Sequence, residues 1–101
     1  MLTNFQTYHL ANELYRQCKG VEARAYLKDQ LLRASLSVVL NVVEGSAKPT
    51  LRERRRFYSI GYASVREVQA LLLILERPKE FDLADQVGAC LYRLSRHSDP
   101  G

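Results

Sequence analysis

The chain has 101 residues, of which 47% are hydrophobic and 26% are charged, and its formal net charge is +4. A chain of this length supports one core that buries roughly two-thirds of its unfolded surface, which excludes two independent domains. Its longest unbroken apolar run, 70–75, is far shorter than the roughly 20 residues that a membrane-spanning helix needs. We therefore expect a single cytoplasmic domain over residues 1–101 with no membrane partner.

The positive charge is concentrated in one part of the chain. From Lys48 to Arg66 the sequence has six basic residues and one acidic residue, Glu53. A basic region of this kind favours polyanionic partners. The two cysteines, Cys18 and Cys90, have no CxxC pattern and no histidine at metal-ligand spacing. We expect reduced thiols in the core, and neither a metal nor another cofactor.

The first predicted helix covers residues 4–18. Apolar side chains recur along one side of it at helical spacing, while His9 falls on the opposite, polar side. Because His9 has no second ligand, we interpret it as a solvated surface residue. Gly20 follows this helix and is suited to a left-handed C-terminal cap.

The second predicted helix, residues 23–44, has more apolar surface than one face can hold. Its leucines and valines cover an arc of about 200°, roughly twice the arc that a surface helix normally buries. This surplus predicts self-association, and the alternative is that the helix is the most enclosed element of a monomer. We expect Gly45 to end the helix in a left-handed conformation, followed by Pro49. The apolar residues are Leu31, Leu32, Leu36, Val38, Val39, Leu40, Val42 and Val43.

The third predicted helix, residues 50–76, is the central element of the bundle. Thr50 and Glu53 form a capping box signature at its start. A seam with alternating spacings of four and three follows and predicts one buried stripe. The residues of this seam are Phe57, Gly61, Ser64, Val68, Leu71 and Leu75.

Basic residues in and before the third helix are the candidate binding residues. Opposite the seam, arginines interleave with Tyr62; guanidinium groups pair with phosphate, and a phenol ring stacks on an unpaired base. The alternative is a solvated face that only aids solubility. Glu67 lies beside the seam, where a carboxylate needs a partner such as Arg33 or Arg56. The candidate nucleic-acid-binding residues are Lys48, Arg52, Arg54, Arg55, Arg56, Tyr62 and Arg66.

The fourth predicted helix covers residues 82–97, with Asp82 as N-cap after a connection that contains Pro78. We find no catalytic constellation, Gly-rich phosphate loop or metal cluster in the sequence pattern, so we predict a protein that is not an enzyme. One enzymatic alternative is a ribonuclease built on Arg93 and His97, which share a helix face at i,i+4 spacing.

Two segments of the sequence resemble a known family. Residues 32–45, LRASLSVVLNVVEG, are similar to the R-A-x-x-S-I-x-x-N-I-A-E-G signature of bacterial four helix bundle proteins. These proteins are found in intervening sequences of large-subunit ribosomal RNA genes and are related to the accessory variability protein of diversity-generating retroelements. Residues 57–68, FYSIGYASVREV, resemble the family block F-x-x-I-A-x-G-S-x-x-E-L. The resemblance spans about residues 4–97.

The resemblance implies an all-α, antiparallel up-and-down four-helix bundle that assembles into a closed homo-oligomer, typically a pentameric ring with a basic surface. In the retroelement relatives the assembly binds nucleic acid and a reverse transcriptase. Carried over by position, the polar residues that fix helix and subunit packing are Arg33, Asn41, Glu44 and Glu67. In this chain Ala63 and Val43 depart from the family pattern.

We therefore predict an oligomeric accessory protein, a pentamer, that binds RNA or DNA through its basic surface and serves as adaptor to a nucleic-acid-processing partner such as a reverse transcriptase. A ring multiplies the basic patch of one subunit, so several weak phosphate contacts sum to useful avidity. The alternative is a protein-interaction scaffold that does not bind nucleic acid.

Overall fold

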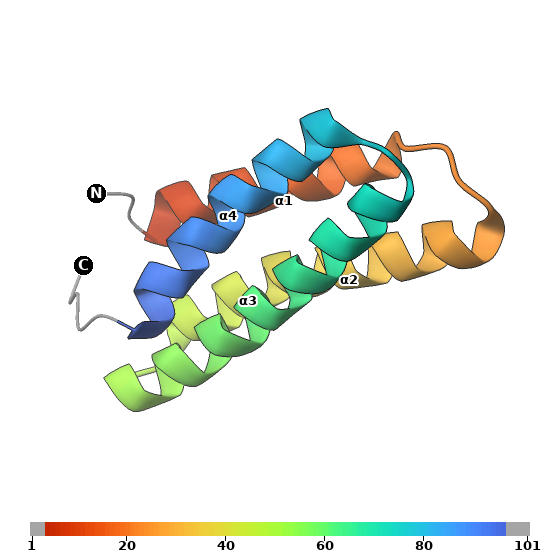
Figure 1. Cartoon of the computed structure of the whole chain (residues 1–101). Helices are drawn as coiled ribbons and strands as arrows, with labels where there is room; N and C mark the ends of the chain where they lie inside the picture. Colours follow the sequence, from red (N-terminus) through yellow and green to blue (C-terminus); the bar gives the residue numbers. More distant parts are fainter. Residues whose placement is uncertain (1–3, 97–101) are drawn as a thin grey trace.

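The computed structural model describes residues 4–96, which form four α-helices joined by short connections (Figure 1). They are α1 (Asn4–Lys19), α2 (Ala25–Ala47), α3 (Leu51–Ile74) and α4 (Pro78–Arg96). The described part of the chain contains no strand. α1 and α3 each pack against both α2 and α4. The prediction of an all-α fold with four packed helices is confirmed. No helix between residues 4 and 96 is long and apolar enough to cross a membrane.

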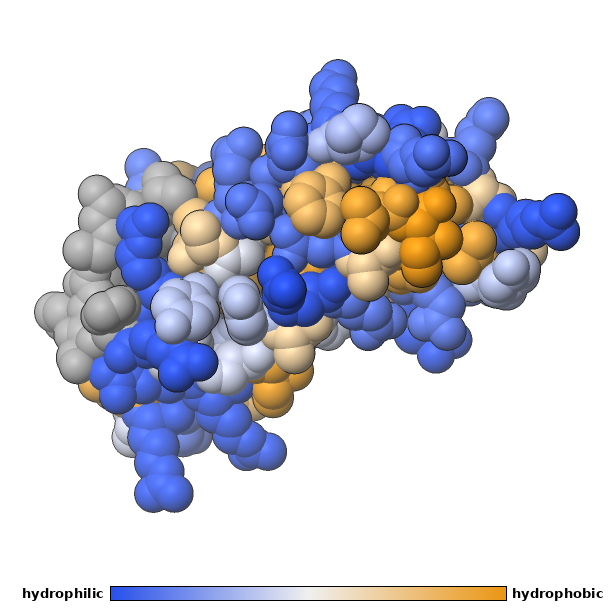
Figure 2. Space-filling model, in the orientation of Figure 1, coloured by the Kyte–Doolittle hydropathy of each residue, from blue (hydrophilic) through white to orange (hydrophobic). Residues whose placement is uncertain are grey.

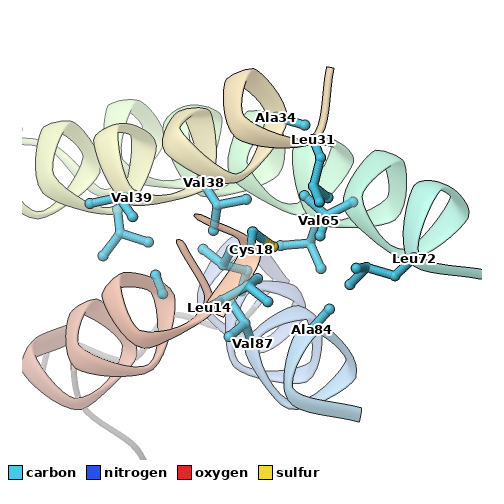
Figure 3. Packing of buried hydrophobic residues seen from close by; sticks show 14 of the residues in the cluster. Leu14, Cys18, Leu31, Ala34, Val38, Val39, Val65, Leu72, Ala84 and Val87 are labelled. Carbon is cyan, nitrogen blue, oxygen red and sulfur yellow. The ribbon is translucent and has the colours of Figure 1, made fainter. Parts of the chain in front are cut away.

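The core lies between the four helices because each contributes one apolar stripe. Figure 3 shows side chains from all four converging there, among them Leu14, Val38, Val65 and Val87. Many of these side chains are valine or alanine, which allow the helices to approach closely. The buried cluster comprises Ala11, Leu14, Cys18, Val21, Leu31, Ala34, Val38, Val39, Val42, Tyr58, Val65, Val68, Leu72, Ala84, Val87 and Leu91.

The connection between α1 and α2 is held by a lysine. The Lys28 ammonium group donates to the carbonyl oxygen of Lys19 at 2.7 Å and to that of Val21. The N–H of Gly20 donates to the carbonyl oxygen of Gln17 at 3.0 Å, and no glycine in residues 4–96 has a positive φ. The predicted left-handed cap at Gly20 is therefore wrong, because Lys28 supplies the donor that satisfies carbonyl groups at this helix end.

α2 continues past its predicted end at Glu44. Gly45 is buried within the helix, which ends at Ala47. A β-carbon at position 45 would lie 2.6 Å from Cε1 of Tyr58 on α3. The predicted left-handed conformation of Gly45 is wrong, since the position requires glycine for the close approach of an aromatic ring and not for a backbone turn.

α3 begins at the predicted N-cap. The N–H of Glu53 donates to Oγ1 of Thr50 at 3.2 Å, and the Thr50 hydroxyl donates to Oε1 of Glu53 at 2.9 Å. Arg54 secures the elbow before the helix, because its Nε donates to the Lys48 carbonyl oxygen at 2.8 Å and its Nη2 to that of Pro49 at 3.4 Å. The elbow between α2 and α3 is thus held by an arginine that the sequence suggested for binding.

The buried stripe of α3 is rotated relative to the predicted seam. Tyr58, Val65 and Leu72 are buried and follow one another at heptad spacing. Because α3 packs between α2 and α4, its most buried line lies between the two contacts. Two members of the predicted seam, Gly61 and Val68, are also buried. The half-buried members are Phe57, Ser64, Leu71 and Leu75.

α3 ends two residues before its predicted end, in a Schellman motif. The N–H of Arg77 donates to the carbonyl oxygen of Leu72 at 2.9 Å, and the N–H of Glu76 donates to that of Leu73 at 3.1 Å. Glu76 adopts the left-handed conformation with φ 56°. This turn reverses the chain into α4.

α4 starts at Pro78 and not at Asp82 as predicted. Proline suits the first position of a helix because its missing N–H would have no helical partner there. In the first turn the Glu80 carboxylate accepts two hydrogen bonds from Arg77, at 3.1 and 2.6 Å. These bonds lower the pKa of Glu80. The connection and the first turn of α4 are therefore fixed by one ion pair.

Candidate nucleic-acid interface

Basic side chains gather at the elbow and the first turns of α3. Arg52 and Arg56 are exposed there, and Figure 2 shows hydrophilic side chains projecting from this end of the molecule, at lower left. The Lys48 ammonium group lies 4.9 Å from the centre of the Phe57 ring. Because Arg54 donates hydrogen bonds to the elbow carbonyl groups, it fixes the backbone next to the first turn of α3, which carries these exposed guanidinium groups.

The predicted binding residues fall into two groups. Lys48, Arg54, Arg55 and Tyr62 are half-buried, whereas Arg52, Arg56 and Arg66 are exposed. Arg66 lies ten residues beyond Arg56, which is roughly 15 Å along the helix axis. The structure therefore places one group at the elbow, while Tyr62 and Arg66 belong to a second location further along α3.

That second location is a groove of about 410 Å³ between α3 and α4. Tyr62 and Arg66 line it from α3, and Tyr92 and Arg93 line it from α4. The ring centres of Tyr62 and Tyr92 are 5.6 Å apart, with planes inclined by 60°. Arg96 places its guanidinium carbon 4.8 Å from the centre of the Tyr92 ring. Aromatic and cationic side chains from two helices thus share one concave surface.

The opposite end of the groove carries a chain of hydrogen bonds. Nη1 of Arg66 donates to Oε1 of Gln69 at 3.3 Å, and Nε2 of Gln69 donates to Oδ1 of Asp85 at 3.2 Å. Gln69 is only 5% exposed, so both ends of its amide are held by partners. This chain fixes the Asp85 carboxylate and the Arg66 guanidinium relative to each other across α3 and α4.

The outer surface formed by α2 and α3 has the opposite character. Leu36, Leu40 and Val43 of α2 are 39, 49 and 44% exposed, and Ile60 of α3 is 43% exposed. We call these four residues the apolar face. The first three follow one another at spacings of four and three, so they lie on one side of α2. Part of the broad apolar arc predicted for this helix is thus unburied in the single chain.

The four residues predicted to fix packing lie in two environments. Asn41 is half-buried between α2 and α3, where its Nδ2 donates to the carbonyl oxygen of Ser37 at 2.8 Å. Arg33, Glu44 and Glu67 are exposed. Glu67 is exposed to solvent in the single chain, so its carboxylate needs no cationic partner there, and its role in packing stays a prediction. Within residues 4–96, salt bridges join Arg16 to Glu13 and Arg77 to Glu80.

Cys18 and Cys90 are free and buried, which confirms the predicted core thiols. Burial raises the pKa of Cys18 to about 11, and it also raises the pKa of Cys90. Both sulfur atoms are therefore protonated and unreactive at neutral pH. In the part of the chain that the structure describes, no three His, Cys, Asp or Glu residues form a metal-binding group.

The structure describes His9 and, of the Arg93–His97 pair, Arg93. His9 is exposed on α1, as predicted, with its ring centre 4.4 Å from that of Phe5. Arg93 is exposed and lines the α3–α4 groove. His97, with the predicted end of the last helix, lies outside the described residues.

Three polar groove residues escaped the sequence prediction, namely Gln69, Asp85 and Tyr92, and Arg93 was considered only for the ribonuclease alternative. A signal was present, because Asp85 and Tyr92 are separated by seven residues and therefore share one side of α4. The sequence did not show how α4 aligns with α3. This alignment places Asp85 and Tyr92 opposite Tyr62 and Arg66.

Comparison with known protein families gave a match. The family model described as 23S rRNA-intervening sequence protein matches residues 5–90, which is most of the chain. No curated protein and no solved structure matched.

Proposed function

Because the chain belongs to the 23S rRNA-intervening sequence protein family, we propose that it is a cytoplasmic, non-enzymatic accessory protein that binds RNA through its basic surface. The observation that carries this proposal is the row of exposed arginines on α3, namely Arg52, Arg56 and Arg66. Arginine pairs bidentately with phosphate, and its planar group is always charged.

The geometry of this row suits a single strand of nucleic acid. Arg52 and Arg66 are separated by fourteen residues, which is roughly 21 Å along the axis of α3. A row of this length can contact several consecutive phosphates. Such contacts release counterions, so binding should weaken steeply as salt is raised.

We further propose that the helices form an antiparallel, up-and-down bundle that self-associates through the apolar face, as a pentameric ring. The support for self-association is the half-exposed row of Leu36, Leu40 and Val43 on α2. Burying these side chains against a second copy would remove apolar surface from water. A ring would also repeat the row of arginines, so that weak contacts of separate subunits add.

The adaptor role, with a reverse transcriptase or another nucleic-acid-processing protein as partner, extends this proposal. The second candidate function is a protein-interaction scaffold that binds no nucleic acid. It is favoured by a separate apolar patch at the α3–α4 connection, where Leu73 and Ile74 are 69 and 65% exposed. Figure 2 shows hydrophobic side chains gathered in this region, at upper right.

The test of RNA binding compares two double variants that change the charge equally. Arg52→Glu with Arg56→Glu alters the elbow, whereas Arg24→Glu with Lys79→Glu alters two exposed residues outside the proposed RNA-binding surface. Affinity for single-stranded RNA is measured between 50 and 200 mM salt. We expect the elbow variant to lose about tenfold or more, with a salt slope about 1.4 lower, since each single-strand phosphate contact contributes about 0.7.

The control variant should keep its affinity within about threefold of the original chain. Equal losses in the two variants would show that net charge alone attracts RNA and would contradict an interface at the elbow. If the unaltered chain binds no RNA even at 50 mM salt, RNA binding is refuted and the scaffold is favoured. Light scattering on the same samples reports the oligomeric state.

A further inference from the structure

We infer that the groove between α3 and α4 holds one unpaired nucleotide whose base carries an exocyclic amino group. The inference rests on the proposed RNA-binding function and adds a base-reading site to it. The volume of about 410 Å³ falls within the range of small-ligand sites. The groove also brings together three kinds of group that match a base face, a base edge and a phosphate.

The middle of the groove is open because its residues on α4 are small. Gly88 and Ala89 lie between Asp85 and Tyr92 in the sequence, so no large side chain of these positions fills the space. A β-carbon at position 88 would lie 3.3 Å from Cγ1 of Val65, so glycine also lets α3 and α4 approach closely. The seven residues from Asp85 to Tyr92 span roughly 10 Å, which leaves room for a planar base between the two side chains.

One end of the groove offers an aromatic surface for stacking. Tyr92 is 44% exposed and Tyr62 is half-buried, with ring centres 5.6 Å apart. The two planes are inclined by 60°, so the rings do not stack face to face. The Arg96 guanidinium carbon lies 4.8 Å from the centre of the Tyr92 ring, so a stacking base uses the other face of this ring or takes the place of the guanidinium group. Phenol rings stack on unpaired bases in single-strand recognition.

The other end offers a fixed acceptor for the edge of a base. The Gln69 amide donates to Oδ1 of Asp85 at 3.2 Å, and this contact orients the carboxylate. Asp85 is exposed, and the bond from Gln69 uses only one of its two carboxylate oxygens. A carboxylate accepts from the amino group of cytosine, whereas uracil presents a carbonyl oxygen at the same place. The acceptor therefore favours cytosine over uracil.

Two arginines supply the charge that a nucleotide phosphate requires. Arg66 and Arg93 are exposed on opposite sides of the groove. Arg66 uses one N–H of its five for Gln69 at 3.3 Å, which leaves other donors for a phosphate oxygen. Because Arg66 is also part of the arginine row on α3, a strand bound along that row can place one base in the groove.

The test uses RNA decamers of cytidine and of uridine, which differ in the base edge. The full chain should bind the cytidine strand about tenfold more tightly, the typical effect of one base-edge contact. Asp85→Asn should bring the ratio to about one, because an amide also offers a donor to uracil. Asp29→Asn, an equal change at an exposed position on α2, should leave the ratio unchanged. A ratio of one in the original chain, or a ratio unaffected by Asp85→Asn, overturns the inference.

Stacking is tested with a second pair of variants. Tyr92→Ala should weaken binding of both strands about tenfold, while Tyr26→Ala, at a tyrosine that is 66% exposed on α2, should not. Circular dichroism shows that each variant is folded. Equal affinities of the two tyrosine variants would exclude a stacking role for Tyr92 and overturn the inference.

A titration with cytidine and uridine monophosphate, followed by amide NMR shifts, separates this inference from the proposed function. We expect cytidine monophosphate to shift the signals of Gly88 and Ala89 more than uridine monophosphate does. If the chain binds RNA through the elbow but neither nucleotide shifts these signals, the groove is excluded and RNA binding stands. If the nucleotide shifts appear but RNA does not bind, the groove is supported and the RNA-binding proposal fails.

Discussion

The two outer surfaces of α3 differ in a way that suits two kinds of partner. Toward α2, the apolar face combines Leu36, Leu40, Val43 and Ile60, although the contact beneath it is partly polar. Toward α4, the surface carries tyrosines, arginines and a carboxylate that Gln69 holds by a hydrogen bond. A protein surface would cover the first, and a polyanion with unpaired bases would match the second.

This difference follows from how one helix divides its circumference. α3 contacts α2 on one flank and α4 on the other, and its most buried line lies between them. Each flank therefore has an outer border that the single chain does not cover. One border is apolar at Ile60 and the other is basic at Arg66, so the proposed assembly contact and the proposed base-reading groove would use different borders of α3.

The largest predicted effect concerns the apolar face. Leu36→Asp combined with Leu40→Asp should reduce the particle to single chains of 11.6 kDa, because two charges would have to be buried in the interface. Loss of the ring should also weaken RNA binding by about 100-fold through lost avidity. Light scattering and an RNA titration measure the two results.

Leu73→Asp is the matched control for this prediction. Leu73 is 69% exposed on α3 but belongs to the patch at the α3–α4 connection. It should leave the particle mass unchanged. If Leu73→Asp dissociates the particle and the double variant does not, assembly uses the patch at the α3–α4 connection, and the proposed role of the apolar face is wrong.

The next effect compares the helix contacts beneath the two surfaces. Gly45→Ala should lower the free energy of unfolding by about 1–2 kcal/mol, since the new β-carbon would lie 2.6 Å from the Tyr58 ring. Gly88→Ala should be close to neutral, because its nearest neighbour is at 3.3 Å and alanine favours the helix. Urea unfolding of both variants measures the difference, and equal losses would contradict the tighter contact at α2.

A smaller effect is expected from the polar contact beneath the apolar face. The hydroxyl groups of Ser37 and Ser64 are 2.9 Å apart across α2 and α3. Ser64→Ala should cost about 1 kcal/mol of unfolding free energy, the usual contribution of one hydrogen bond. Ser59→Ala, at an exposed position of the same helix, should change it by less than about 0.5 kcal/mol. The same urea series compares them.

The smallest predicted effect is the pH dependence of stability that comes from the Arg77–Glu80 ion pair, which belongs to neither surface. The hydrogen bonds from Arg77 lower the pKa of Glu80, so the stability that this ion pair contributes is present above the unfolded pKa of about 4.3 and is lost as the pH falls through the folded value. Because Arg77 is 41% exposed, solvent screening keeps this contribution small. The free energy of unfolding, measured with urea, should therefore fall less between pH 7 and pH 3 in Glu80→Gln than in the original chain. The same pH dependence in the variant and in the original chain would contradict a stabilising role of this ion pair.

Local signals predicted the fold well where one residue decides the outcome. The capping pair Thr50 and Glu53 marks the start of α3 correctly, and the apolar spacing identifies all four helices. The ends of α2 and α3 and the start of α4 were less predictable. At Gly45 the deciding contact is with Tyr58, which is distant in sequence. At Pro78 a residue that stops helices is also one of the best residues to begin one.

The candidate site was predictable only in part for the same reason. The sequence identifies the basic residues, but a guanidinium group gives no sign of whether it faces water or holds a carbonyl group, as Arg54 does. The groove needs two helices at a defined offset. Asp85 and Gln69 become partners only when α4 lies against α3, and no spacing within either helix contains that information.

The polar contact between α2 and α3 also affects the register of the two helices, that is, their relative position along the helix axis. The Ser37 hydroxyl lies 2.9 Å from that of Ser64, and Asn41 packs against Gly61. A slip by one helical turn would move α2 by about 5.4 Å and separate the Ser37 hydroxyl from that of Ser64. The two serines thus help to set the register of α2 against α3, and with it the offset between Leu40 and Ile60 that any neighbouring copy would have to fit.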